Sequence, residues 1–195
     1  MEGRELPTDG VITGTGYVAP AVMLEFGARS TGEPSEPRAI TCDAAAHLPG
    51  VEFPSATPRV MRAERTFWEK ATAIHVFCIQ GAFRGGDRFA RHWHDVTRLD
   101  AAGFVDPAIA DKALARAVAD HKSMFFAEKN PQGKVIDYHA AVTGGLQLAP
   151  DNEVLAKLAA DYQHMVDDGL FLDDAEPFEA LMERCRSVEQ KANSI

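Results

Sequence analysis

A lysine and an aspartate near the middle of the chain are the residues best suited to chemistry. Lys70 ends the stretch ERTFWEK, and Asp95 lies in the stretch RHWHDV. A lysine ammonium holds a phosphate as a point charge, and a carboxylate beside it orients or deprotonates a reacting group. If both side chains converge on one cleft, we expect the ammonium and the carboxylate about 4 to 8 Å apart, with a phosphate between them.

Both residues also have purely structural explanations. Lys70 falls at the rim of an apolar helical face, where a lysine commonly extends its ammonium into water. Asp95 stands four residues after Arg91, and an exposed helical ion pair at that spacing contributes only about 0.3 to 0.5 kcal/mol. Spacing alone therefore leaves the structural and the functional interpretations open.

Three arginines extend the candidate phosphate site. Arg65 lies five residues before the lysine on the same predicted helix, and Arg88 and Arg91 fall on the polar face of the next one. Segment 59–98 holds eight basic and four acidic residues, a net charge of +4 in a chain whose net charge is −9. Such a segment either faces phosphates or forms a solvated helical surface.

A further carboxylate stands near the N-terminus. Glu25 lies within the apolar run VMLEFGAR, which is typical of a strand. On a half-buried strand this side chain simply faces solvent. A carboxylate that points from a strand into a cleft is also what Mg²⁺-assisted phosphoryl transfer uses.

A strand-rich front and a helical remainder must position these residues. Apolar runs bounded by Gly and Pro predict strands at 10–18, 21–29, 38–42 and 59–63, with a surface loop at 30–37. Helical periodicity and caps predict helices at 64–80, 89–99, 106–126, 151–169 and 176–192, with a looser segment at 127–150. The predicted fold class is α+β, a small, incomplete sheet followed by an α-helical bundle, divided into domains 1–63 and 64–195.

Composition excludes several classes of protein. The 195 residues are 46% hydrophobic and 25% charged, which excludes disorder throughout. The sequence predicts no membrane span and no secretory signal, and hence a cytoplasmic protein. Three widely spaced cysteines, at 42, 78 and 185, fit neither a disulfide framework nor a paired-cysteine metal site.

The chain resembles the AbiEii/AbiGii nucleotidyltransferase toxin family of bacterial abortive-infection and toxin–antitoxin systems. The resemblance rests on three stretches, VMLEFGAR (22–29), ERTFWEKATAIH (64–75) and RHWHDVTRL (91–99). It implies a polymerase-β-like nucleotidyltransferase core followed by a helical domain. It also implies NTP and Mg²⁺ as cofactors, a cognate antitoxin and, in some relatives, an RNA acceptor.

The resemblance assigns roles to individual residues. Lys70 matches the motif lysine, implied to contact the nucleotide phosphates. Asp95 and Arg91 match the aspartate and the arginine of the next motif, and His92 stands where many relatives have Asp. Glu25 matches an acidic position on a core strand, with an implied catalytic and metal-binding role.

One motif of the family does not occur in this sequence. The family begins with a Gly/Ser turn and an Asp-x-Asp strand that holds the metal, and the 195 residues contain no Asp-x-Asp. We therefore expect a toxin component that lacks its metal-binding segment and is inactive alone, with that segment on another polypeptide or encoded upstream. The alternative is a non-catalytic nucleotide-binding or protein-interaction remnant. An incomplete sheet also predicts self-association through its exposed edge.

Overall fold

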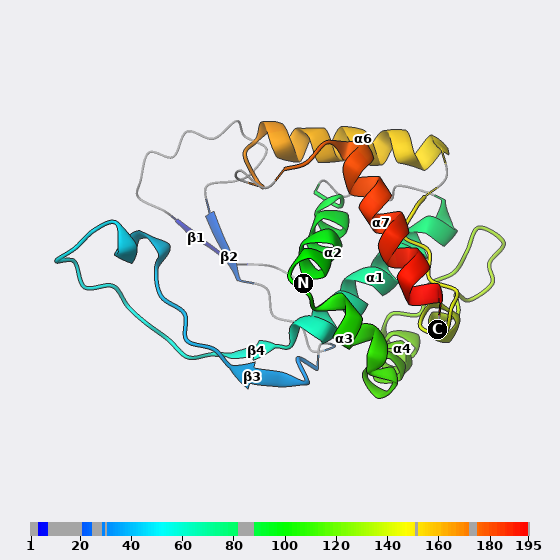
Figure 1. Cartoon of the computed structure of the whole chain (residues 1–195), viewed down its shortest axis with the longest axis horizontal. Coiled ribbons are helices and arrows are strands. Elements are labelled where there is room, and N and C mark those ends of the chain that lie inside the picture. The colour runs from blue at the N-terminus through cyan, green and yellow to red at the C-terminus, as the bar shows by residue number, and fades with distance from the viewer. Residues whose placement is uncertain are drawn as a thin grey trace.

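The computed structural model describes residues 4–7, 21–24, 29, 31–81, 88–150, 152–171 and 175–194. Within them, short strands come first and helices follow (Figure 1). The predicted α+β class, a small sheet component with a helical bundle, is confirmed. None of the helices described here combines the length and the apolar character that crossing a bilayer requires.

The described strands form two antiparallel pairs. β1 (Arg4–Pro7) pairs with β2 (Ala21–Leu24), and β3 (Ser35–Pro37) pairs with β4 (Arg59–Met61). Two of the predicted strands are thus confirmed, the one at 21–29 over its first four residues and the one at 59–63 over its first three. The strand predicted at 10–18 lies outside the described residues, and β1 was not predicted.

The predictions for the segment leading into β3 were wrong. The stretch expected to be a surface loop contains β3, and the strand expected at 38–42 is reduced to a single bridge between Ile40 and Ala56. Polar contacts hold the strand pair, because the Arg59 guanidinium donates to the hydroxyl and the carbonyl oxygen of Ser35. A pair held in this way carries no alternating apolar pattern in its sequence.

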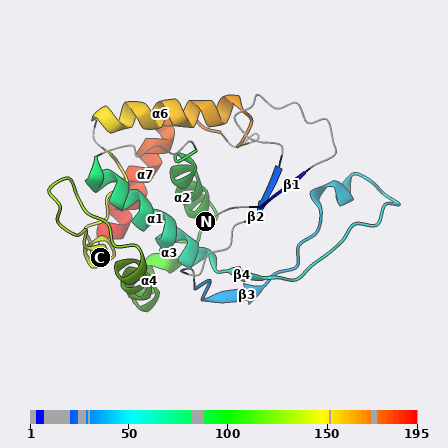
Figure 2. The same ribbon diagram turned by 180° about the vertical axis from the view of Figure 1, so that it is seen from behind.

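A long excursion separates β3 from β4. We call residues 38–58 the arm; it contains a short 3₁₀ turn, η1 (Asp43–Ala46). Both views show the arm reaching away from the helices (Figures 1 and 2). No residue between 31 and 62 is buried, so the arm adds nothing to the hydrophobic core.

The described helices follow from residue 63 onward. They are α1 (Ala63–Gln80), α2 (Arg91–Ala101), α3 (Val105–Ala110), α4 (Lys112–Phe125), α5 (Tyr138–Ala141), α6 (Asn152–Asp167) and α7 (Phe178–Asn193). Four predicted helices, those now labelled α1, α2, α6 and α7, are confirmed to within two residues at each end. The change from strands to helices falls at residue 63, while the division into two domains stays a prediction.

The single helix predicted at 106–126 was wrong. It is broken at Asp111, whose backbone leaves the helical region (φ −81°, ψ 79°) and whose carboxylate accepts a hydrogen bond from the Leu114 N–H at 2.9 Å. Asp111 therefore caps a new helix, α4, by satisfying one of its free N–H groups. Asp106, expected to cap the start of that helix, lies instead inside the first turn of α3, which begins one residue earlier, at Val105. The looser segment that follows contains the short helix α5.

Helix α1 lies at the centre of the bundle and packs against α2, α3 and α4. Phe67, Ala71 and Ile74 of its apolar stripe are buried, and so are residues on its other faces, including Trp68 and His75. The Trp68 indole N–H donates to the Ala108 carbonyl of α3 at 2.9 Å. Helix α1 ends at Gly81, whose positive φ of 59° lets its N–H bond back to Phe77. A helix this deeply buried is a fixed platform for Lys70.

Candidate phosphate-binding site

Lys70 and Asp95 meet directly between α1 and α2. The Lys70 Nζ lies 2.9 Å from Asp95 Oδ2, and the side chains are 27% and 39% exposed. The two side chains meet, as the sequence predicted, at a shorter distance than the separation of about 4 to 8 Å expected for a pair with a phosphate between them. Among the described residues Asp95 pairs with Lys70 and not with Arg91. The ion pair within α2 that the four-residue spacing of Arg91 and Asp95 suggested is therefore not what the structure shows.

Packing of the two helices explains this meeting. Trp93 and Val96 are both fully buried on either side of Asp95, and the Trp93 ring meets the Phe77 ring of α1 edge-on at 5.3 Å between centroids. This apolar contact fixes α2 against α1. The polar rims of the two helices then face each other, and the pair remains accessible from solvent.

A second set of charged side chains, centred on Glu69, lies next to the Lys70–Asp95 pair. The Glu69 carboxylate lies 2.9 Å from the Arg65 guanidinium and 2.6 Å from the Lys122 ammonium of α4. Burial alone would raise the pKa of Glu69, but Lys122 and Arg65 outweigh it and hold this pKa below its usual value. Arg65, which the sequence suggested as a phosphate contact, is only 4% exposed. Its side chain supports Glu69.

His92 lies where these charges act together. Burial, followed by the positive charges of Lys70 and Arg91, lowers the pKa of His92 to about 4. The imidazole packs edge-on against Phe89 at 4.9 Å. Its Nδ1 is buried without a hydrogen-bond partner among the described residues. At neutral pH this side chain is uncharged, so the positive potential comes from its neighbours.

The predicted position of Arg88 on the polar face of α2 was wrong. Arg88 precedes the helix and has a positive φ of 67°. Its backbone N–H and that of Ala90 donate to the Asp161 carboxylate of α6, at 2.8 and 2.7 Å. Asp161, only 8% exposed, therefore caps the start of α2 from another helix, so the turn that holds Arg88 is fixed through its backbone. Arg91, in contrast, is an exposed residue in the first turn of α2.

The described residues do not offer a site for Mg²⁺. They contain no group of three or more His, Cys, Asp or Glu side chains that could hold a metal ion. The carboxylates of Asp95 and Glu69 are each paired with cations, and it is the cationic partners that suit an anion. Glu25, the predicted metal ligand, lies outside the described residues.

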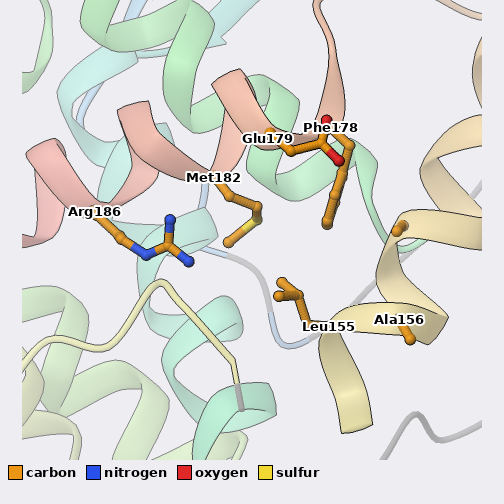
Figure 3. A pocket seen from close by; sticks show the side chains of 7 residues that line it. Leu155, Ala156, Phe178, Glu179, Met182 and Arg186 are labelled. Carbon is orange, nitrogen blue, oxygen red and sulfur yellow. The ribbon is translucent and has the colours of Figure 1, made fainter. Parts of the chain in front are cut away.

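A separate pocket of about 330 Å³ lies between α6 and α7. Figure 3 shows Leu155 of α6 facing Met182 and Phe178 of α7. The lining is mostly apolar and includes none of the residues that the sequence singled out. The full set of lining residues is Leu155, Ala156, Ala159, Phe178, Glu179, Met182 and Arg186.

Comparison with known proteins places the chain in a family. The family model described as nucleotidyl transferase AbiEii toxin, type IV TA system, matches residues 3–184. The chain therefore belongs to the AbiEii nucleotidyltransferase toxin family, as its motifs predicted. A type IV toxin–antitoxin family implies a cognate antitoxin, and nucleotidyltransferases generally use an NTP with a divalent metal ion. No curated protein and no solved structure gives a significant match.

Proposed function

We propose that this chain is a nucleotidyltransferase toxin component in which Lys70 contacts the phosphates of an NTP and Asp95 is the adjacent catalytic carboxylate. The observation that carries the proposal is the 2.9 Å ion pair between these two motif residues, made across two helices and open to solvent. Family membership supports it independently.

The geometry suggests how the two residues act. An incoming phosphate competes with Asp95 for the Lys70 ammonium, which remains positively charged throughout. The released carboxylate then accepts the proton of the acceptor hydroxyl. The hydroxyl oxygen forms a bond to the α-phosphorus as the bond to the β-phosphate oxygen breaks, and pyrophosphate leaves.

We further propose that nucleotide transfer requires an Asp-x-Asp segment in addition to these 195 residues, which contain none. Glu25 would contribute a third carboxylate to the Mg²⁺ site of the completed enzyme. Because phosphoryl transfer depends on positioning and on metal charge, the chain alone binds an NTP weakly and transfers no nucleotide.

Label transfer tests this proposal. The purified chain is incubated with each labelled NTP, with Mg²⁺ or Mn²⁺ and with total tRNA. We expect no label on the RNA, and robust transfer would overturn the proposed inactivity. In a binding assay with the same NTPs, Lys70→Gln should abolish retention. Lys112→Gln on the exposed side of α4 is the matched control and should bind as the parent does.

The missing motif also favours a second candidate function, a non-catalytic protein that binds nucleotide. The two candidates differ in one respect, because only the enzyme component gains transfer activity when a family Asp-x-Asp segment is supplied in trans. Transfer that then depends on Asp95, tested with Asp95→Asn, would support the enzyme. Binding without transfer under the same conditions would support the binding protein.

The partners follow from the same proposal. We propose an RNA acceptor and a cytoplasmic site of action, because NTPs and RNA are found together there. We also propose self-association through further strand pairing at the β1–β2 sheet, as expected for a sheet that is incomplete. Light scattering at several concentrations tests the last point, and a monomer at every concentration would contradict it.

A further inference from the structure

Two further cations share one aromatic ring beside the site: Arg29, the last residue of the first family stretch, and Lys122, which lies outside the three stretches. The Lys122 ammonium of α4 lies 4.9 Å from the centroid of the Phe126 ring, and the Arg29 guanidinium carbon lies 5.6 Å from the same centroid. Arg29 is held at α4 by its backbone as well, because His121 Nε2 lies 2.7 Å from its carbonyl oxygen. The end of the N-terminal strand region thus brings a positive charge to Lys122.

Lys122 also connects this pair of cations to the Lys70 site. Its ammonium is bonded to Glu69, the neighbour of Lys70 on α1. Its charge is one of those that lower the pKa of His92, together with the charges of Lys70 and Arg91. Burial is the main cause of this low pKa, and Asp95 opposes the three cations. The contact that joins α1 to α4 here is the ion pair between Glu69 and Lys122.

The balance of charge at this place favours an anion. The side chains that these contacts bring together hold four cations and two carboxylates, an excess of two positive charges: Arg29, Arg65, Lys70, Lys122, Glu69 and Asp95. The side chain of Lys122 is 14% exposed and that of Lys70 27%. Partly buried ammonium groups are screened less by salt than exposed ones and attract an anion more strongly.

We propose that Lys122, with Arg29, forms the second half of a polyphosphate-binding site whose first half is Lys70. This inference rests on the proposed function and extends it, since it assigns the ligand as the triphosphate of an NTP. Glu69 uses one of the three ammonium protons of Lys122 and holds the side chain in place, so little rotamer freedom is lost when phosphate binds. A triphosphate places several charges within a few ångströms, as a cluster of this kind requires.

The test measures binding of inorganic tripolyphosphate and inorganic phosphate to the full chain by calorimetry, without a metal or an acceptor. We expect Lys122→Gln to weaken tripolyphosphate binding about tenfold and phosphate binding less than about twofold, because only the longer anion reaches both lysines. Lys122→Arg should retain most of the affinity. Lys112→Gln, on the same helix but away from the cluster, is the matched control and should leave both affinities unchanged.

A second readout separates binding from a structural role. The pKa of His92, followed by NMR, should rise when tripolyphosphate binds to the parent chain, because a nearby anion stabilises the imidazolium. The rise should be smaller in Lys122→Gln. An unchanged rise, together with unchanged affinity, would overturn the inference even if the variant is as stable as the parent.

The failure of this inference can be distinguished from failure of the proposed function. If Lys70→Gln abolishes tripolyphosphate binding and Lys122→Gln does not weaken it, the proposed function stands and the inference is wrong. If the parent chain binds no tripolyphosphate, both are wrong. If Lys122→Gln weakens binding of single-stranded RNA and leaves tripolyphosphate binding intact, the surface contacts an RNA backbone and the inference is again overturned.

Discussion

The segment from residue 31 to residue 62 and the helical body after it are built on different principles. The first has no buried residue and is held by local polar contacts such as those of Arg59 with Ser35. The body has a continuous core that includes both tryptophans and α1. Because hydrophobic burial is the main source of stability, the body carries the fold and the arm is free to vary. The charged site belongs to the body, at the rim of its core.

Core substitutions should show the largest difference between the two regions. Trp93 is fully buried, and its indole N–H donates to the Leu148 carbonyl at 2.7 Å. We expect Trp93→Ala to lower the free energy of unfolding by about 3 to 5 kcal/mol. Val51→Ala in the arm, where the side chain is 55% exposed, should change it by less than about 0.5 kcal/mol. Urea titration measures both, and equal effects would contradict the comparison.

Removing a cap should have the next largest effect. Asp161→Ala leaves the backbone N–H groups of Arg88 and Ala90 without their acceptor, at a cost of about 1 to 3 kcal/mol. Asp43→Ala in the exposed turn η1 is the matched control and should be nearly neutral. The same variants should be assayed for NTP binding, because loosening the start of α2 displaces Asp95. A neutral Asp161→Ala would show that α2 needs no support from α6.

Acid should destabilise the body selectively. Burial lowers the pKa of His75 to about 4, below the value of about 6.5 in an unfolded chain. Between these values the unfolded state binds more protons, so the free energy of unfolding falls as pH falls from 6.5 towards 4. His75 contributes about 3 kcal/mol to this loss. Its Nδ1 accepts the Gln147 N–H, a bond that the side-chain oxygen of His75→Gln can also accept.

Urea titrations at several pH values measure this dependence. His75→Gln should flatten the loss of stability between pH 6.5 and 4. His47→Gln, in the exposed arm, is the control and should leave the curve unchanged. A parent-like slope in His75→Gln would mean that other groups cause the acid sensitivity.

Thiol labelling compares the two regions with the mildest change, since neither of the two cysteines compared is substituted. Cys42 of the arm is exposed, whereas Cys185 of α7 is buried and its pKa is raised to about 12 by burial. We expect a water-soluble thiol reagent to label Cys42 at once and Cys185 only after denaturant is added, because the thiolate is the reactive form. Mass spectrometry of peptides from a Cys78→Ser variant identifies each site. Early labelling of Cys185 would show that α7 opens readily.

The helices could be predicted because their apolar residues recur at helical spacing, as Phe67, Ala71 and Ile74 do in α1. The break at Asp111 was missed because one capping carboxylate interrupts a pattern that is otherwise continuous. The exposed pair of β3 and β4 was only half predicted, since polar contacts leave no period of two in the sequence.

The candidate site was predicted in part for a similar reason. Lys70 and Asp95 stand in two short motifs on neighbouring helices, so the sequence places them near each other. Lys122 and Asp161 reach the site from helices far along the chain, and the Arg88 contact with Asp161 spans 73 residues. Nothing local marks such partners, because packing of the finished core selects them.

The order of synthesis means that the contact between Asp161 and the start of α2 forms late. Chains emerge from the ribosome N-terminus first, at about 5 to 20 residues per second. Asp95 is therefore synthesised about 3 to 13 seconds before the Asp161 carboxylate that secures its helix, and Lys70 of α1 is made earlier still. A nascent chain carries both motifs without a firmly oriented α2. For a toxin, this delay postpones a competent site until most of the chain has left the ribosome.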